Sequence, residues 1–240
     1  MRAAPPGGAT HHQLRHPVFL RIDNVLGADV LERVTAQLAH GHFEDGRKTA
    51  GWNARLVKNN LQLEPGSKAA EELRKVVTEA LLRNAAFEMA ARPKLMRPLT
   101  FARYEPGMEY GWHVDDPLMG GPPPLRTDLA FTLFLCDPAG YDGGELVVQA
   151  PQGNQGFKPP AGSLVLYPAS TLHRVAPVTR GVRLVAISWV QSLVRDGHQR
   201  ELLYELDVAR REVFESNGKC PAFDRINRIL GNLVRLWAEP

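Results

Sequence analysis

Cysteine is scarce in this 240-residue chain, which contains only Cys136 and Cys220. One pair of cysteines cannot form the disulfide framework that stabilises many small secreted domains. The N-terminal segment also lacks the apolar core of about 7–15 residues that a secretory signal peptide requires. We therefore expect a cytoplasmic protein with reduced thiols, which begins with a flexible leader over residues 1–16.

Long apolar runs and long basic runs are missing as well. No apolar stretch approaches the ~20 residues that a membrane-spanning helix needs. The net charge is +3, but the lysines and arginines are scattered and never form a run of five. We therefore expect neither a membrane nor a nucleic acid among the partners of this protein.

The residues that are present have the balance of a soluble globular protein, with 44% hydrophobic and 23% charged. In the first half of the chain, apolar residues recur at helical spacing in two segments. They predict one helix over residues 30–40 and another from just after Pro65-Gly66 to about Phe87. These helices form a helical support over residues 27–90, which we expect to cover one side of a sheet.

Short β-rich runs form the rest of the main domain, which we expect to span residues 17–192. One run covers residues 17–22, and six or more follow between residues 98 and 192, separated by glycine and proline. This pattern predicts a jelly-roll core. Apolar residues at three- and four-residue intervals then predict a helical appendage over residues 193–240. The predicted fold is mainly β with flanking helices.

A short motif, His113-Val114-Asp115, carries two side chains of the kind that bind metal ions. Residues two apart in a strand point to the same face, so both could serve one ion. A histidine from another strand would complete a set of two histidines and one carboxylate, which leaves three positions of an octahedral iron open. The motif alone is a weak indication, because such pairs readily arise by chance.

His173 and Arg183 lie in consecutive strand-like runs, joined by a turn between Pro177 and Gly181. If this turn is centred near Val178, the two residues face each other across an antiparallel pair. Arg183 would then lie beside a metal ligand, where its planar guanidinium suits a ligand carboxylate. The spacing equally allows Arg183 to face solvent at a strand end or to pair with an aspartate in the core.

Several longer runs occur in one order: KTAGWNARLVKNNLQL, RYEPGMEYGWHVDD, RTDLAFTLFL, YDGGELVV, GSLVLYPASTLHRVAPVTRG and WVQSLVRD. They closely resemble the bacterial PKHD-type hydroxylases, which are relatives of the prolyl 4-hydroxylases. The resemblance covers roughly residues 18–196 and, more loosely, the tail that ends in LVRLWAE. It implies a double-stranded β-helix and a dioxygenase that depends on Fe(II) and 2-oxoglutarate. Such an enzyme hydroxylates a C–H bond and releases succinate and CO2.

The resemblance also implies roles for individual residues in the metal site. Fe(II) would be held by His113, Asp115 and His173, and the far carboxylate of 2-oxoglutarate by Arg183. Tyr104 matches a tyrosine that hydrogen-bonds the same carboxylate in related prolyl hydroxylases.

Two further residues are expected on the substrate side. Tyr110 matches a family tyrosine nearer the substrate, and Asn60 is expected at the mouth of the cleft. Packing within the barrel would explain Tyr110 or Tyr104 without a function, and a polar turn would explain Asn60. The loop over residues 116–126 is rich in proline and glycine, and it is expected to be either a hinged lid or a static connector.

The resemblance favours an amino-acid, peptidyl or siderophore-like substrate, with dioxygen as the second reactant and ascorbate as an accessory reductant. The C-terminal helices are a candidate surface for a homo-oligomer. Two other functions stay open from the residues. One is a non-catalytic jelly-roll module that binds a small acidic ligand through Arg183. The other is nucleic-acid demethylation by the same iron chemistry, for which Trp52 and Trp112 could stack on bases but no basic cluster accompanies them.

Overall fold

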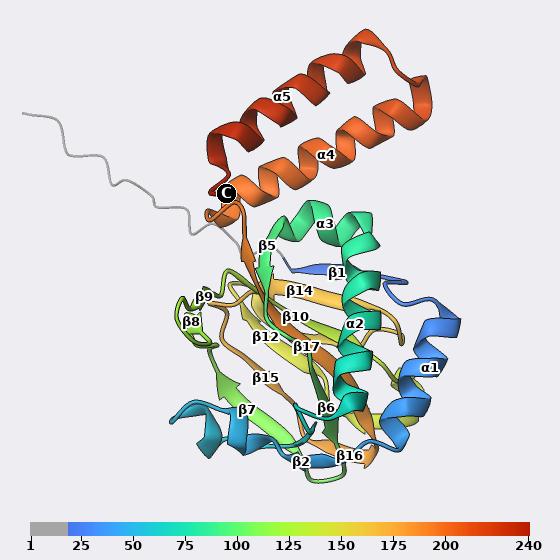
Figure 1. Ribbon diagram of the computed structural model, residues 1–240, viewed down its shortest axis with the longest axis vertical. Helices are drawn as coiled ribbons and strands as arrows, with labels where there is room; N and C mark the ends of the chain where they lie inside the picture. The colour runs from blue at the N-terminus through green and yellow to red at the C-terminus, as the bar shows by residue number, and fades with distance from the viewer. Residues whose placement is uncertain (1–18) are drawn as a thin grey trace, which may run out of the picture.

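Two antiparallel sheets lie face to face in the computed structural model, which describes residues 19–240 (Figure 1). The predicted leader over residues 1–16 lies outside the described residues, as do the first two residues of the strand predicted over 17–22. The larger sheet has eight strands in the order β1-β14-β10-β17-β6-β4-β2, with β5 also paired to β17. These strands are β1 (Leu20–Ile22), β2 (Phe43–Asp45), β4 (Leu61–Leu63), β5 (Pro93–Met96), β6 (Thr100–Tyr104), β10 (Leu129–Phe134), β14 (Leu164–Pro168) and β17 (Arg183–Ser192).

The smaller sheet has five strands in the order β13-β12-β15-β7-β3. They are β3 (Lys58–Asn59), β7 (Glu109–His113), β12 (Leu146–Ala150), β13 (Gly153–Phe157) and β15 (His173–Val175). Two hydrogen-bonded strand pairs complete the β structure: β8 (Leu118–Met119) with β9 (Leu125–Arg126), and β11 (Tyr141–Gly143) with β16 (Val178–Gly181). Short 3-10 helices, η1 (Gly46–Thr49), η2 (Ala54–Leu56) and η3 (Pro138–Gly140), lie in the connections.

Strand β10 is buried on both faces, because it separates two hydrophobic cores. Leu129, Phe131 and Leu133 point to the core beneath the helices, whereas Ala130 and Phe134 point to the core between the two sheets. Residues on the same face of a strand alternate with those on the other, so a continuous apolar run serves both cores. The space between the sheets is the part of the fold in which the site lies.

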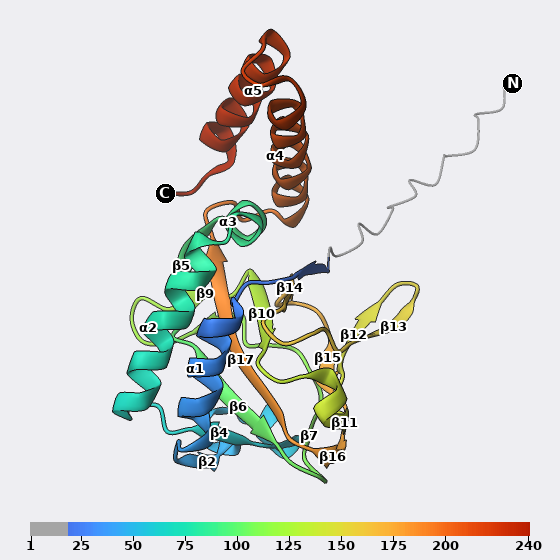
Figure 2. The same cartoon turned by 90° about the vertical axis from the view of Figure 1, so that its right-hand side faces the viewer.

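Three helices cover the outer face of the larger sheet (Figure 2): α1 (Ala28–Ala39), α2 (Lys68–Arg83) and α3 (Ala85–Ala91). These helices lie in the region predicted as a helical support, but the single helix predicted as far as Phe87 is wrong. The chain breaks at Asn84, whose backbone is extended and whose side chain accepts a hydrogen bond from the backbone N–H of Phe87. An asparagine in this position caps a new helix rather than continuing the old one.

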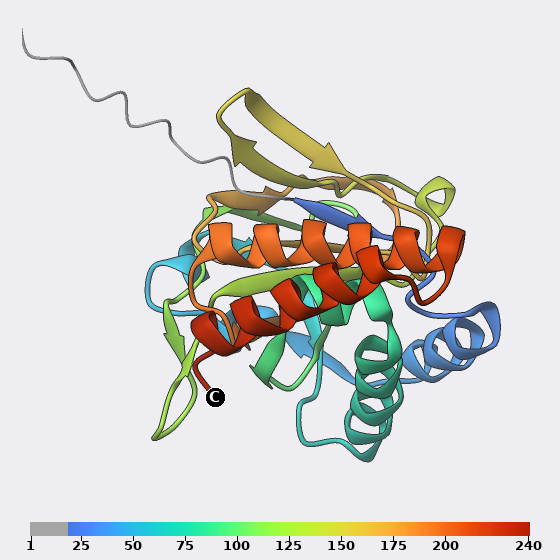
Figure 3. The same cartoon turned by 90° about the horizontal axis from the view of Figure 1, so that it is seen from above.

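The C-terminal appendage is a hairpin of two helices, α4 (Gly197–Asn217) and α5 (Pro221–Trp237), that projects from one end of the sheets (Figures 1 and 2). Seen from above, the two helices lie side by side over the sheets (Figure 3). The appendage is attached by apolar packing of Val194, just beyond β17, with Leu203 and Leu230, and by polar contacts. The buried carboxylate of Asp207 on α4 lies 3.6 Å from the guanidinium of Arg92, and the ammonium of Lys94 donates to the backbone carbonyls of Glu239 and Pro240. Among the described residues, no helix is long and apolar enough to cross a membrane.

Candidate active site

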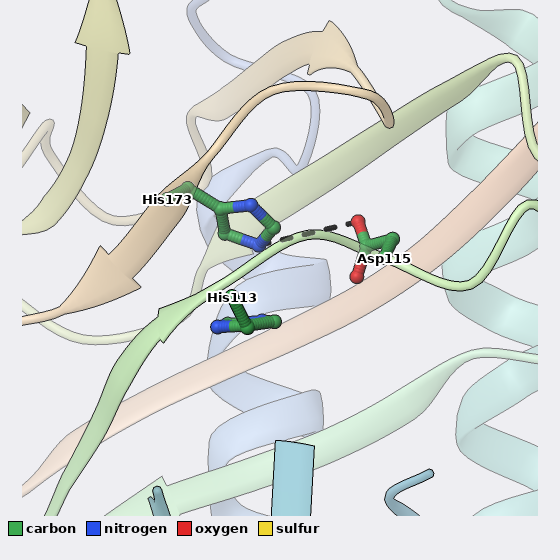
Figure 4. Close-up of side chains that lie close together, drawn as sticks. All are labelled: His113, Asp115 and His173. Carbon is green, nitrogen blue, oxygen red and sulfur yellow. Dashed lines mark ion pairs between the residues drawn. The ribbon is translucent and has the colours of Figure 1, made fainter. Parts of the chain in front are cut away.

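The pairing of β7 with β15 brings two histidines together. His113 and His173 are direct partners in this antiparallel pair, and their ring centroids lie 4.2 Å apart. Asp115 follows two residues after His113, beyond the end of β7, and its Oδ2 lies 4.0 Å from Nε2 of His173 (Figure 4). One ligand atom from each of the three residues lies within 4.8 Å of the others. The prediction that Asp115 shares a strand face with His113 is therefore wrong in detail, although the two side chains converge.

The backbone fixes how each imidazole is protonated. Nδ1 of His113 lies 2.8 Å from the carbonyl oxygen of Gly111, and Nδ1 of His173 lies 2.9 Å from that of Thr171. A carbonyl oxygen only accepts, so each Nδ1 carries the proton and donates it. Burial and the neighbouring His173 lower the pKa of His113 to about 3, so its ring is neutral near pH 7. Each Nε2 is left with a free lone pair, as a metal ligand needs.

Asp115 is buried, and among the described residues its one ion-pair contact is His173, which is a cation only when protonated. Its side chain is 7% exposed, and burial raises the pKa of the carboxyl group, although His173 and Trp189 act in the opposite direction. Its Oδ2 has no hydrogen-bond partner among the described residues. A buried carboxylate without a partner is costly, and a bound cation would offset that cost. Two imidazoles and one carboxylate form the donor set of a non-haem Fe(II) site, so these residues fit the metal that the sequence implies.

Arg183 reaches the same cavity from the opposite sheet. The expected antiparallel pair of His173 and Arg183 is wrong, because β15 pairs with β7 and β12, whereas Arg183 on β17 pairs with Tyr104 on β6. The turn between them contains β16, which pairs with β11 instead. The chain thus crosses from one sheet to the other between the two residues, and they meet across the sandwich rather than along a ladder.

The guanidinium of Arg183 is buried among aromatic rings. The residue is 1% exposed, and its Cζ lies 4.9 Å from the ring centroid of Tyr104 and 5.3 Å from that of Phe134. None of its three guanidinium nitrogens has a hydrogen-bond partner among the described residues, and no carboxylate of that part of the chain pairs with it. The alternatives of a solvent-facing arginine and an arginine paired with a core aspartate are therefore wrong. A buried cation without an ionic partner is costly, and an anionic ligand in the cavity would offset that cost.

The two groups of residues open onto one cavity of about 560 Å³ between the sheets. Its lining includes the candidate metal-binding cluster of His113, Asp115 and His173. Arg183, Tyr104 and Tyr110 line it as well. The ring of Tyr110 stacks on His113 with centroids 3.6 Å apart, whereas Tyr104 lies deeper, beside Arg183. Leu118 and Met119 of the β8–β9 hairpin also line the cavity, so the loop predicted over residues 116–126 does border the site.

Asn60 does not line this cavity. It is 2% exposed, and its side chain lies close to the hydroxyl of Tyr104, whose pKa is raised by burial against the lowering influence of Arg183 and then of Asn60. Neither polar atom of the Asn60 side chain has a hydrogen-bond partner among the described residues. Sequence reasoning also missed Lys58, Thr49 and Gln62, all of which line the cavity. The one feature of the sequence that pointed to these residues was their position in the run KTAGWNARLVKNNLQL. The polar composition of this run is equally typical of a surface loop.

Family models match two parts of the chain. The model described as the 2OG-Fe(II) oxygenase superfamily matches residues 99–191, and the PKHD-type hydroxylase C-terminal domain matches residues 197–239. A PKHD-type hydroxylase of Synechococcus sp. (strain JA-2-3B'a(2-13)) is 50% identical over 223 residues, which cover 92% of this chain and 100% of that relative.

Two solved structures share the architecture. One is a prolyl-4-hydroxylase of Pseudomonas putida, with a TM-score of 0.50 and 22% identity, covering 72% of this chain and 92% of that one. The other is a prolyl hydroxylase of Trichoplax adhaerens in complex with a peptide fragment of the hypoxia inducible factor oxygen degradation domain. Its TM-score is 0.52 at 20% identity, covering 77% of this chain and 86% of that one. These likenesses confirm the predicted jelly-roll core. Together with the 50% identity to its cyanobacterial relative, they show that the chain belongs to the PKHD-type hydroxylases of the 2OG-Fe(II) oxygenase superfamily.

Proposed function

We propose that His113, Asp115 and His173 hold Fe(II) in this hydroxylase and that Arg183 binds the far carboxylate of 2-oxoglutarate. The observation that carries the proposal is the guanidinium of Arg183. It is fully buried, unpartnered among the described residues and open to the same cavity as the clustered metal-binding side chains. A dicarboxylate that reaches from the metal to this guanidinium satisfies both ends of the site at once.

The bound iron and co-substrate supply the chemistry, in which 2-oxoglutarate, O2 and a C–H bond give succinate, CO2 and an alcohol. The residues of this chain hold and shield the reactants. The two imidazoles, each fixed by a backbone carbonyl, and the carboxylate of Asp115 would hold the metal, and three protein ligands would leave positions for the co-substrate and dioxygen. The rings of Tyr104 and Phe134 exclude water from the guanidinium, which strengthens its pairing with an anion.

Tyr104, Tyr110 and Asn60 take different parts in this arrangement. Tyr104 lies beside Arg183, so we assign its hydroxyl to the same carboxylate of the co-substrate, with the buried side chain of Asn60 close to it. Tyr110 stacks on His113 and lines the cavity, where it faces the substrate and keeps the imidazole in place. Asn60 is thus a positioning residue rather than a contact to substrate.

We assign the oxygenase reaction to residues 17–192 and a supporting role to the helical appendage over 193–240. The reaction takes place in the cytoplasm, where Cys136 and Cys220 remain as the free thiols that the structure shows. The substrate is a small molecule or a peptidyl group with an unreactive C–H bond, of the amino-acid, peptidyl or siderophore-like classes. The peptide bound to the Trichoplax neighbour favours a peptidyl substrate only by analogy of fold.

The proposal is tested by turnover of the co-substrate alone. Protein loaded with Fe(II) under argon and then exposed to O2 is expected to convert 2-oxoglutarate slowly to equal amounts of succinate and CO2, without an added substrate. N-oxalylglycine, an unreactive analogue of 2-oxoglutarate, should suppress this turnover. Succinate measured by mass spectrometry and CO2 released from carboxyl-labelled 2-oxoglutarate provide the readouts. Absence of turnover in protein that binds Fe(II) would contradict the proposal.

Gly144 offers a second test, because it packs directly against Arg183. Its φ is +67°, and a Cβ at this position would lie 2.9 Å from Cδ of Arg183 and 3.1 Å from the ring of Tyr141. We expect Gly144→Ala to displace the guanidinium and raise the KM for 2-oxoglutarate by roughly tenfold, since the new methyl group pushes against Arg183 and misaligns its charge-assisted hydrogen bonds. Gly153→Ala is the matched control, because Gly153 also has a positive φ, +117°, but a Cβ there meets nothing within 4 Å. Equal KM values in the two variants would contradict the expectation.

A further inference from the structure

A second buried cation, Lys58, lies in the cavity and is not explained by the metal or by the co-substrate. It belongs to β3 at the edge of the smaller sheet, where its Cα partner is Tyr110 on β7. The residue is 7% exposed, and its Nζ lies 5.2 Å from the ring centroid of Tyr110, whose ring stacks on His113. Lys58 thus enters the cavity from the sheet that carries the histidines, whereas Arg183 enters from the other sheet.

The contacts of Lys58 hold its ammonium in place without neutralising it. Nζ donates to Oγ1 of Thr49 at 3.1 Å, and that hydroxyl donates in turn to Oε1 of Gln62 at 2.7 Å. All three side chains line the cavity. Among the described residues, no carboxylate lies within ion-pair distance of Nζ, and the charges of Asp115 and Asp45 act on it only from farther away. Two of the three ammonium protons therefore remain for a ligand.

Burial without an acidic partner is unusual for lysine and costs stability. Burial lowers the pKa of Lys58 to about 8, which leaves most of the molecules charged at neutral pH. The cost of holding this charge in the cavity would be offset by an anionic oxygen brought in from solution. The co-substrate cannot serve both cations in the proposed function, because its far carboxylate pairs with Arg183 and its 2-oxo acid end faces the metal.

Two exposed apolar side chains, Val114 and Leu118, line the same cavity as Lys58, together with Ala50 and Ala54 from the segment before β3. The segments before β3 and after β7 lie side by side, because the backbone N–H of Gly111 donates to the carbonyl of Val57 and β3 pairs with β7. We call Val114 and Leu118, which are 48% and 59% exposed, together with Ala50 and Ala54 the apolar rim. An apolar patch beside a reactive cavity is typical of a binding surface.

We propose that Lys58 binds a carboxylate of the primary substrate, whose apolar part lies against the apolar rim. This inference rests on the proposed function and extends it, because it assigns the substrate to the amphipathic carboxylic acids, such as a free acid or a chain-terminal residue. Thr49 and Gln62 hold the ammonium in position, and the substrate carboxylate takes the two remaining N–H groups. Lys58 and the three metal-binding side chains line the same cavity, so a substrate held by Lys58 would place its C–H bond in that cavity.

The test compares two probes that differ only in charge, hexanoate and hexanamide. Protein loaded with Fe(II) under argon is saturated with N-oxalylglycine, so that Arg183 is occupied and no turnover occurs. Calorimetric titration is then expected to show hexanoate binding about 10- to 100-fold more tightly than hexanamide, because a charge-assisted hydrogen bond replaces a neutral one. Lys58→Met, which keeps the length of the side chain, should abolish this preference, and Lys58→Arg should retain part of it.

Lys48→Met is the matched control, since Lys48 lies one residue from Thr49 but is 63% exposed and paired with Glu44. This variant should keep the preference for hexanoate. Equal binding of the two probes to the unaltered protein, or a preference that survives in Lys58→Met or disappears in Lys48→Met, would overturn the inference. A collapse of N-oxalylglycine affinity in Lys58→Met would assign Lys58 to the co-substrate and overturn it as well. If the unaltered protein failed to bind N-oxalylglycine, this result would instead contradict the proposed function, and the inference would fall with it.

Discussion

A His113→Ala or Asp115→Ala variant is expected to lose Fe(II) affinity by more than about 100-fold. Residues that merely orient a metal ligand already contribute roughly 10- to 100-fold to affinity, and these two provide the ligand atoms themselves. Neither can be replaced by a neighbour, because the structure gathers only His113, Asp115 and His173 into a metal-binding cluster within residues 19–240. Calorimetric titration with Fe(II) under argon measures the loss.

The thermal stability of the metal-free variants shows whether a loss of Fe(II) affinity results from misfolding. Asp115 carries a buried carboxyl oxygen without a partner, so metal-free Asp115→Ala is expected to be at least as stable to heat as the unaltered protein. His42→Ala serves as the matched histidine control, because the His42 side chain is 77% exposed and lies outside the cavity. An unchanged Fe(II) affinity in either site variant would refute the assignment of the ligands.

Arg183→Ala is expected to raise the KM for 2-oxoglutarate by roughly 30- to 1000-fold. Truncating one partner of a buried, charge-assisted pair costs on the order of 2–4 kcal/mol, much of it from the anion left unpaired. Arg183→Lys should recover part of the affinity, since it restores the charge without the two parallel donors. The KM is measured from succinate formation at increasing 2-oxoglutarate, at a fixed saturating concentration of Fe(II).

Arg180→Ala is the matched control for this variant. Arg180 lies three residues earlier, has a side chain that is 61% exposed and pairs with Asp142 on the surface. Its removal should leave the KM unchanged, because a surface ion pair contributes little. A normal KM in Arg183→Ala would mean that the carboxylate is held elsewhere in the cavity, with Lys58 as the other buried cation to examine.

Much of the local structure was predictable because it is encoded in contiguous residues. Alternating and helical spacings placed the long strands β6, β10, β12, β14 and β17 and the first helix within a few residues of their observed bounds. The short strands between residues 43 and 63, and β7, which carries His113, were not among the predicted β-rich runs. The break at Asn84 was missed, because the apolar spacing continues across it and only the capping contact to Phe87 reveals it. Residue spacing indicates which face of a helix is apolar, but not that the helix restarts on a new axis.

The sequence by itself determined the chemical identity of the site. The order of several motifs indicated two histidines, one carboxylate and one arginine as the residues of the candidate site. Each motif is a run of neighbouring residues, so it can be recognised without coordinates. It also determined the mainly β architecture, since alternation of apolar residues along a strand is a local property.

Only the tertiary structure decided how those residues meet. His173 pairs with His113 rather than with Arg183, and Arg183 faces them from the other sheet, because the chain crosses between the sheets in the turn that contains β16. Asn60, which was expected at the mouth of the cleft, lies buried near Tyr104, and Lys58 lines the cavity. Pairing between strands distant in the chain depends on how their faces pack against both cores, and no spacing along the sequence contains that information.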